Sequence, residues 1–84
     1  MSRAIVTIYT RPGCHLCEQA KSNILAAAGR DLFVLEEVNI DDDPMLVDRY
    51  NDDIPVVLIN GIRAFKHRVE TRQFERKLGR HLRN

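Results

Sequence analysis

The sequence predicts an α/β domain whose elements follow the order β-α-β-α-β-β-α. Apolar runs of strand length alternate with stretches of helical periodicity, a cysteine pair stands between the first run and the first helix, and an Asn-Gly turn separates the last two strands. The chain has 84 residues, of which 44% are hydrophobic. We therefore expect one domain, residues 1–84, with a single modest core.

The first half of the chain predicts two strands and one helix. Residues 4–9 form a short β-rich run, and residues 10–13 follow as a loop. From His15 onward apolar residues recur at helical spacing, and Gly29 stands at the expected helix end because glycine tolerates positive φ there. Residues 32–40 alternate loosely between apolar and polar positions and predict the second strand.

The Asp-Asp-Asp-Pro stretch at residues 41–44 predicts the start of a second helix. Asp43 suits the N-cap and Pro44 suits the first helical position, so a short helix is expected to run to about Tyr50. The three aspartates also raise the question of a calcium site. They lack the spaced oxygen ligands, the turn glycine and the closing glutamate of an EF-hand loop, so helix capping is the preferred interpretation.

A hairpin and a third helix complete the chain. Residues 55–59 are almost wholly apolar and predict a central strand buried on both faces. Asn60-Gly61 is a strong hairpin signal, because both central positions of a type I′ turn need positive φ, and it leads into a fourth strand at residues 62–66. From about Thr71 the pattern predicts an amphipathic helix. Its apolar positions are Phe74, Leu78 and Leu82.

The two cysteines form the motif Cys14-His15-Leu16-Cys17 at the junction between the first strand and the first helix. A helix N-terminus stabilises negative charge, so the pKa of Cys14 should fall from about 8.5 into the ~4–7 range of such motifs. Arg11 and a protonated His15 would add positive charge nearby. Cys17 lies one turn further on and should point inward. The spacing predicts Cys14 as the nucleophile of disulfide exchange and Cys17 as the resolving thiol.

Composition restricts the expected partners. The chain has 13 basic and 12 acidic residues, for a formal net charge of +1, which gives no case for nucleic acid or an anionic membrane as partner. No segment approaches the ~18 apolar residues of a membrane span, and the N-terminal stretch does not resemble a secretory signal. We therefore expect a monomer in a reducing cytoplasm, where a close cysteine pair is catalytic or metal-binding.

Metal binding through the same cysteine pair is the alternative function. Copper, zinc and iron–sulfur clusters all bind thiolates, but a structural zinc site needs four protein ligands. His15, His67 and His81 are widely spread along the chain and form no ligand-like pair. We accordingly predict no metal site.

The sequence resembles a glutaredoxin, and more narrowly the small glutaredoxin-like proteins of thioredoxin fold. The resemblance rests on TIYTRPGCHLC at residues 7–17, IPVV at residues 54–57 and the NG turn at residues 60–61. It implies a four-stranded mixed sheet in the order 2-1-3-4, flanked by three helices. The first and third helices would lie on one face of the sheet and the second on the other.

The resemblance also implies an activity and a substrate groove. By base rate the Ile54–Pro55 bond would be trans, whereas the matching proline of glutaredoxins is cis and faces the thiol pair. The backbone of the residue that matches Ile54 hydrogen-bonds substrate like an added strand. The expected function is thiol–disulfide oxidoreduction on protein or low-molecular-weight disulfides, without a resident cofactor, and with glutathione or a reductase as the reductant. Substrate-binding candidates are Arg11, Ile54 and Pro55.

Two departures from the glutaredoxin pattern limit what can be carried over. His15 and Leu16 stand where glutaredoxins have Pro-Tyr, and the residues between the thiols influence the redox potential. Residues 64–71 lack the glycine pair whose amides hold the γ-glutamyl end of glutathione in that family. Glutathione therefore stays open as a co-substrate.

Overall fold

The computed structural model describes residues 3–82, and its centre is a mixed sheet in the order β2-β1-β3-β4. Strand β1 (Ala4–Thr10) runs parallel to β2 (Phe33–Asn39) and antiparallel to β3 (Val56–Ile59). Strand β4 (Ile62–Lys66) pairs antiparallel with β3 and forms one edge. The predicted sheet and its strand order are confirmed.

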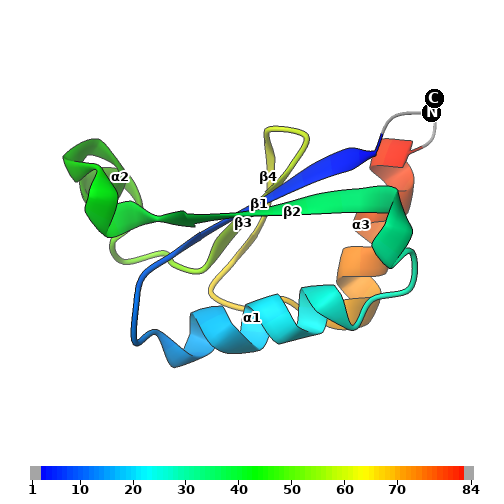
Figure 1. Ribbon diagram of the computed structural model, residues 1–84, viewed down its shortest axis with the longest axis horizontal. Helices are drawn as coiled ribbons and strands as arrows, with labels where there is room; N and C mark the ends of the chain where they lie inside the picture. The colour runs from blue at the N-terminus through cyan, green and yellow to red at the C-terminus, as the bar shows by residue number, and fades with distance from the viewer. Residues whose placement is uncertain (1–2, 83–84) are drawn as a thin grey trace.

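Three helices flank the sheet, as predicted (Figure 1). Helices α1 (His15–Leu25) and α3 (Thr71–Leu82) lie on the same side of the sheet. Helix α2 (Pro44–Tyr50) lies at the end of the sheet where β1 and β2 have their C-termini. Two short 3₁₀ helices, η1 (Arg30–Leu32) and η2 (Ile40–Asp42), precede and follow β2. Within residues 3–82 no helix is long and apolar enough to cross a membrane.

Alternating side chains of the strands divide the apolar residues between two clusters on opposite faces. The large cluster lies between the sheet and α1 and α3. Its buried members are Ala4, Val6, Ile8, Ala20, Ile24, Ala27, Phe33, Val57, Ile59, Phe65, Val69, Phe74 and Leu78. The small cluster lies beneath α2 on the other face. It consists of buried Ile40, Tyr50 and Val56 with partly buried Tyr9, Leu46, Val47, Ile54 and Leu58.

Local sequence signals account for the start of α2 and for the hairpin. The Asp43 carboxylate accepts the Met45 N–H at 2.9 Å, and Pro44 follows it as the first helical residue. Asn60 and Gly61 have φ values of 52° and 80°, the left-handed conformation that this tight turn requires. Both predictions are confirmed.

The end of the first helix differs from the prediction. Gly29 has the expected positive φ of 82°, but it caps η1, because α1 already ends at Leu25. A tertiary contact explains the difference: the Glu75 carboxylate on α3 accepts the Ala28 N–H at 2.7 Å. Ala27 is buried in the large cluster, so the turn after α1 is fixed by packing against α3.

Candidate functional site

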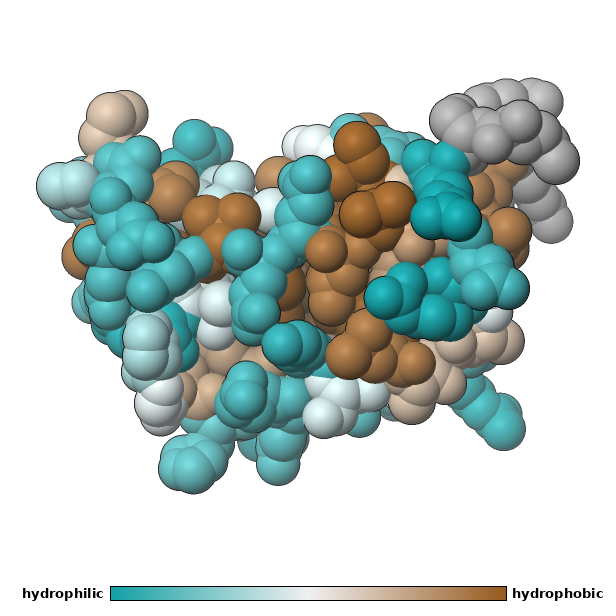
Figure 2. Space-filling view, in the orientation of Figure 1, coloured by the Kyte–Doolittle hydropathy of each residue, from teal (hydrophilic) through white to brown (hydrophobic). Residues whose placement is uncertain are grey.

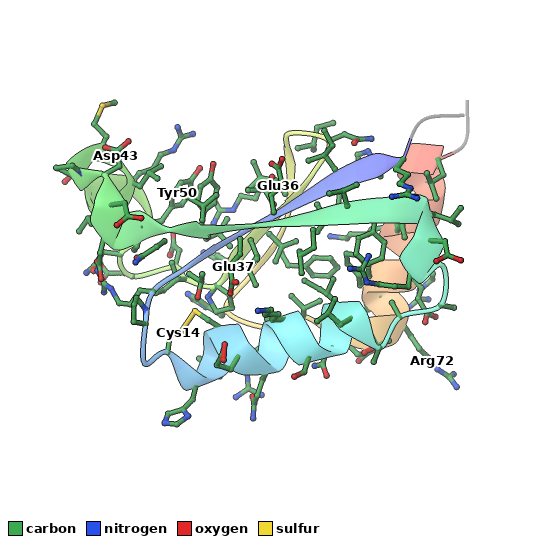
Figure 3. The ribbon with its side chains drawn as sticks, in the orientation of Figure 1. Cys14, Glu36, Glu37, Asp43, Tyr50 and Arg72 are labelled. Atoms are coloured by element: carbon green, nitrogen blue, oxygen red, sulfur yellow. A yellow bond between two sulfur atoms is a disulfide. The ribbon has the colours of Figure 1, made fainter. Side chains whose placement is uncertain are left out.

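Cys14 occupies the N-cap of α1, where its sulfur accepts one of the free N–H groups of the first helical turn. Its backbone is extended, with φ −88° and ψ 106°, and its Sγ accepts the Cys17 N–H at 3.2 Å. The two cysteines form a disulfide, and their Cα atoms are 5.2 Å apart. Figure 3 shows Cys14 at the start of α1. The helix terminus thus directs a donor at the outer sulfur, as the sequence predicts.

The two cysteines differ in exposure. Cys14 is half-buried, whereas Cys17 is only 2% exposed. Cys17 shares the inner side of α1 with Ala20 and Ile24, which are buried as well. An attacking group can therefore reach Cys14 more readily than Cys17, which is the asymmetry that the two predicted roles need.

The Ile54–Pro55 peptide bond is cis, as the resemblance implies. Tyr9 of β1 pairs with Val56 of β3, so the residues before Val56 run alongside the loop that follows β1 and leads to Cys14. The Ile54 N–H donates to the Tyr50 carbonyl at 3.2 Å. This N–H is therefore already engaged within the protein.

Arg11, the third predicted substrate-binding residue, is held by one acidic and one amide side chain. Its Nε and Nη2 both donate to Asp41, with 2.8 Å from Nη2 to Oδ1, and its Nη1 donates to the Asn51 Oδ1 at 2.7 Å. The hydrogen bond to Asp41 raises the pKa of the Arg11 guanidinium, which stays charged. Asp41 and Asn51 lie 30 and 40 positions from Arg11, so no local sequence signal indicates that they contact it.

A surface cavity of about 460 Å³ adjoins Cys14. It opens between the start of α1 and the end of β2, and its wall includes Arg11, Glu18, Glu37 and Asn39. In Figure 3 Glu37 extends from β2 towards α1, while Glu36 points to the opposite side of the sheet. Figure 2 shows the apolar residues of this face gathered around β2 and the second half of α1, so the surface near the start of α1 is mostly hydrophilic.

Comparison with known proteins identifies the family. A family model described as “Glutaredoxin-like domain (DUF836)” matches residues 5–79. The chain belongs to the glutaredoxin-like family. A “Glutaredoxin-like protein YDR286C homolog” of Dictyostelium discoideum is 37% identical over 71 residues, a match that covers 77% of this chain and 66% of that relative. The glutaredoxin-like chain thus spans just under two thirds of the relative's length.

Solved structures support the same fold. The target protein XcR50 from X. campestris superposes on the glutaredoxin-like chain with a TM-score of 0.76 and 30% identity, over 89% of this chain and 96% of that one. A mutant thioredoxin from Halobacterium salinarum superposes with a TM-score of 0.72 over 99% of this chain and 78% of that one. Its 9% identity supports the thioredoxin fold alone.

The connection between β4 and α3, residues 67–70, contains no glycine. His67 adopts a positive φ of 70°, and its N–H donates to the Pro55 carbonyl at 2.8 Å, so this connection supports the cis-proline loop. A second cavity of about 300 Å³ opens between α1 and this connection. Its wall includes Gln19, Asn23, Arg68 and Glu70, which offer polar contacts but no glycine amides.

The ligand set available to a metal ion is small. Within residues 3–82, no three side chains of His, Cys, Asp or Glu gather in a group suited to metal coordination. A zinc ion held by Cys14 and Cys17 would therefore need further ligands from another molecule.

Proposed function

We propose that this glutaredoxin-like chain is a thiol–disulfide oxidoreductase in which Cys14 attacks the substrate and Cys17 resolves the intermediate. The proposal rests on one observation, the 3.2 Å contact between the Cys14 sulfur and the Cys17 N–H at the start of α1. Donors and a helix N-terminus favour a sulfur anion over a thiol, so they activate Cys14 in the reduced protein. The burial of Cys17 keeps the second thiol away from competing reactants.

The reaction proceeds by two thiol–disulfide exchanges. The Cys14 thiolate attacks one sulfur of a substrate R–S–S–R′, the bond from Cys14 to the R sulfur forms, and R′S⁻ leaves and takes up a proton from water. Cys17 then loses its proton and attacks the Cys14 sulfur. The Cys14–Cys17 disulfide forms, and RS⁻ leaves and is protonated. The protein loses two electrons and the substrate gains two.

The cis-proline loop would hold the substrate beside the thiols. A peptide or glutathione moiety pairs with the Ile54 carbonyl, and Pro55 shapes the adjoining wall. Arg11 binds a substrate carboxylate only if that carboxylate displaces Asp41, because its guanidinium is already engaged. The substrates are disulfides of proteins or of low-molecular-weight thiols.

The partners follow from the same chemistry. Glutathione or a reductase returns the Cys14–Cys17 disulfide to the dithiol, and glutathione acts as a co-substrate, not a resident cofactor. We place the protein, as a monomer, in a reducing cytoplasm, because a disulfide that must be reduced in each cycle needs a supply of thiol.

A mixed-disulfide trap tests this proposal. The Cys17→Ser variant should retain one glutathione per chain after exposure to glutathione disulfide, since the resolving thiol is gone, and the mass increase is read by mass spectrometry. The matched Cys14→Ser variant should retain almost none. Equal labelling of both variants, or no labelling of Cys17→Ser, would contradict the assignment of roles.

The same trap separates exchange from metal transfer. Cell extract applied to Cys17→Ser should yield disulfide-linked proteins that a reductant releases, and their identity gives the substrate. Metal analysis of the anaerobically purified wild-type protein is the companion measurement. Stoichiometric copper, zinc or iron would support the metal-binding alternative.

A further inference from the structure

The basic side chain that precedes the thiol pair is bound by an aspartate from a distant segment. Arg11 donates from Nε and Nη2 to Asp41, and the ion pair has a shortest distance of 2.8 Å. Asn51 accepts from the remaining Nη1 at 2.7 Å. The Asp41 N–H in turn donates to the Asn39 side chain at 2.9 Å, which holds η2 in place at the end of β2. The guanidinium thus has a fixed position and a neutralising partner.

This ion pair lies in the immediate surroundings of the reactive sulfur. The Cys14 N–H donates to the Arg11 carbonyl at 3.3 Å, so one tight turn connects the two residues. The Arg11 and Cys14 side chains also line the same cavity. A charge on Arg11 therefore acts on a Cys14 thiolate that borders the same cavity.

We propose that Asp41 is a positioning residue that raises the basicity of the Cys14 thiolate by pairing with Arg11. The proposal rests on the thiol–disulfide function proposed above. An unpaired Arg11 cation would stabilise the thiolate, and hence the reduced protein, and would make the disulfide more oxidising. Asp41 offsets this cation. With Arg11 paired in this way, the helix N-terminus is the main group that stabilises the Cys14 thiolate. The structure thereby assigns to Asp41 a control over redox potential.

Charge substitutions separate this role from a structural one. Asp41→Asn removes the negative partner and should lower the pKa of Cys14, whereas Arg11→Gln removes the cation and should raise it. In water, exposed unit charges roughly 8–10 Å apart interact by about a third of a pKa unit, so each shift should be about this size or smaller. The double variant should return close to the wild-type value. A loosened loop would instead shift both single variants in the same direction.

Two matched controls test the contacts and the net charge. Asp42→Asn changes the charge of the same 3₁₀ helix without touching the guanidinium, and Asn51→Ala removes a hydrogen bond from Arg11 without changing charge. Neither should move the pKa of Cys14 by as much as Asp41→Asn does. Each variant is first checked by circular dichroism and thermal unfolding.

The experiment is an absorbance titration of the Cys14 thiolate in the Cys17→Ser background, followed by equilibration of the dithiol forms with a reference dithiol. We expect opposite pKa shifts for Asp41→Asn and Arg11→Gln, and an equilibrium constant about twofold more oxidising for Asp41→Asn, or about 9 mV for a two-electron couple. Shifts of the same sign, or a shift equal to that of Asp42→Asn, would overturn the proposal. Failure of the glutathione trap with intact opposite shifts would overturn the exchange function and leave this electrostatic coupling standing.

Discussion

The two apolar clusters on opposite faces of the sheet support different parts of this protein. The large cluster contains the aromatic core, in which the Phe33 and Phe74 rings meet edge to face at 5.3 Å. The small cluster depends on one stacked pair, Tyr9 on Tyr50, with ring centroids 4.6 Å apart. Most of the buried apolar surface therefore lies on the α1 and α3 side, and we expect that side to dominate stability.

The same two clusters position different parts of the thiol site. Cys17 lies on the side of α1 that also carries buried Ala20 and Ile24 of the large cluster, so that cluster fixes the Cys17 sulfur. The small cluster instead fixes the residues that contact the loop before Cys14. Tyr50 directly precedes Asn51, and the Tyr50 carbonyl accepts the Ile54 N–H. Global stability and site geometry therefore depend on separate sets of contacts.

Phe74→Ala should have the largest effect on stability. The side chain is fully buried and contacts two other rings, so its removal should lower the free energy of unfolding by about 3–5 kcal/mol. Urea unfolding followed by circular dichroism measures this change. Exchange with glutathione disulfide, counted per folded molecule, should stay near the wild-type rate. A loss below about 1 kcal/mol would show that the large cluster is not the stabilising one.

Tyr50→Ala should have the opposite balance of effects. The stacked pair and part of the small cluster disappear, which should cost about 2–3 kcal/mol, less than Phe74→Ala costs. The exchange rate per folded molecule should fall, because Asn51 and Ile54 lose a fixed position beside the thiol loop. Unfolding and exchange assays on the same preparations provide both values. An unchanged exchange rate would argue against a link between the small cluster and the site.

Asp43→Ala should have the smallest and most local effect. It removes the N-cap bond to Met45 and should cost about 1 kcal/mol. Amide hydrogen exchange should accelerate in α2 and little in β1 or β3, because α2 packs on the small cluster. The control Asp43→Asn keeps an acceptor at the cap. Equal acceleration throughout the sheet would show that the two faces unfold together.

Much of the fold follows from short-range signals in the sequence. Asp43 and Pro44 mark a helix start, Asn60 and Gly61 mark a tight hairpin, and Cys14 stands one residue before a helical pattern. Each of these features depends on backbone groups within about four residues, so the local sequence suffices to predict it. The strand order and the cis bond are predicted only by the resemblance to glutaredoxins, and the structure agrees with both predictions.

The surroundings of the thiols are not a local property. The sequence determined that Cys14 caps a helix, that Cys17 follows one turn later and that Arg11 precedes them. Only the tertiary structure decided that Arg11 meets Asp41 and Asn51. These partners come together because the parallel pairing of β1 with β2 brings the C-terminal ends of both strands to one edge, and no rule that acts within a single element specifies such a contact.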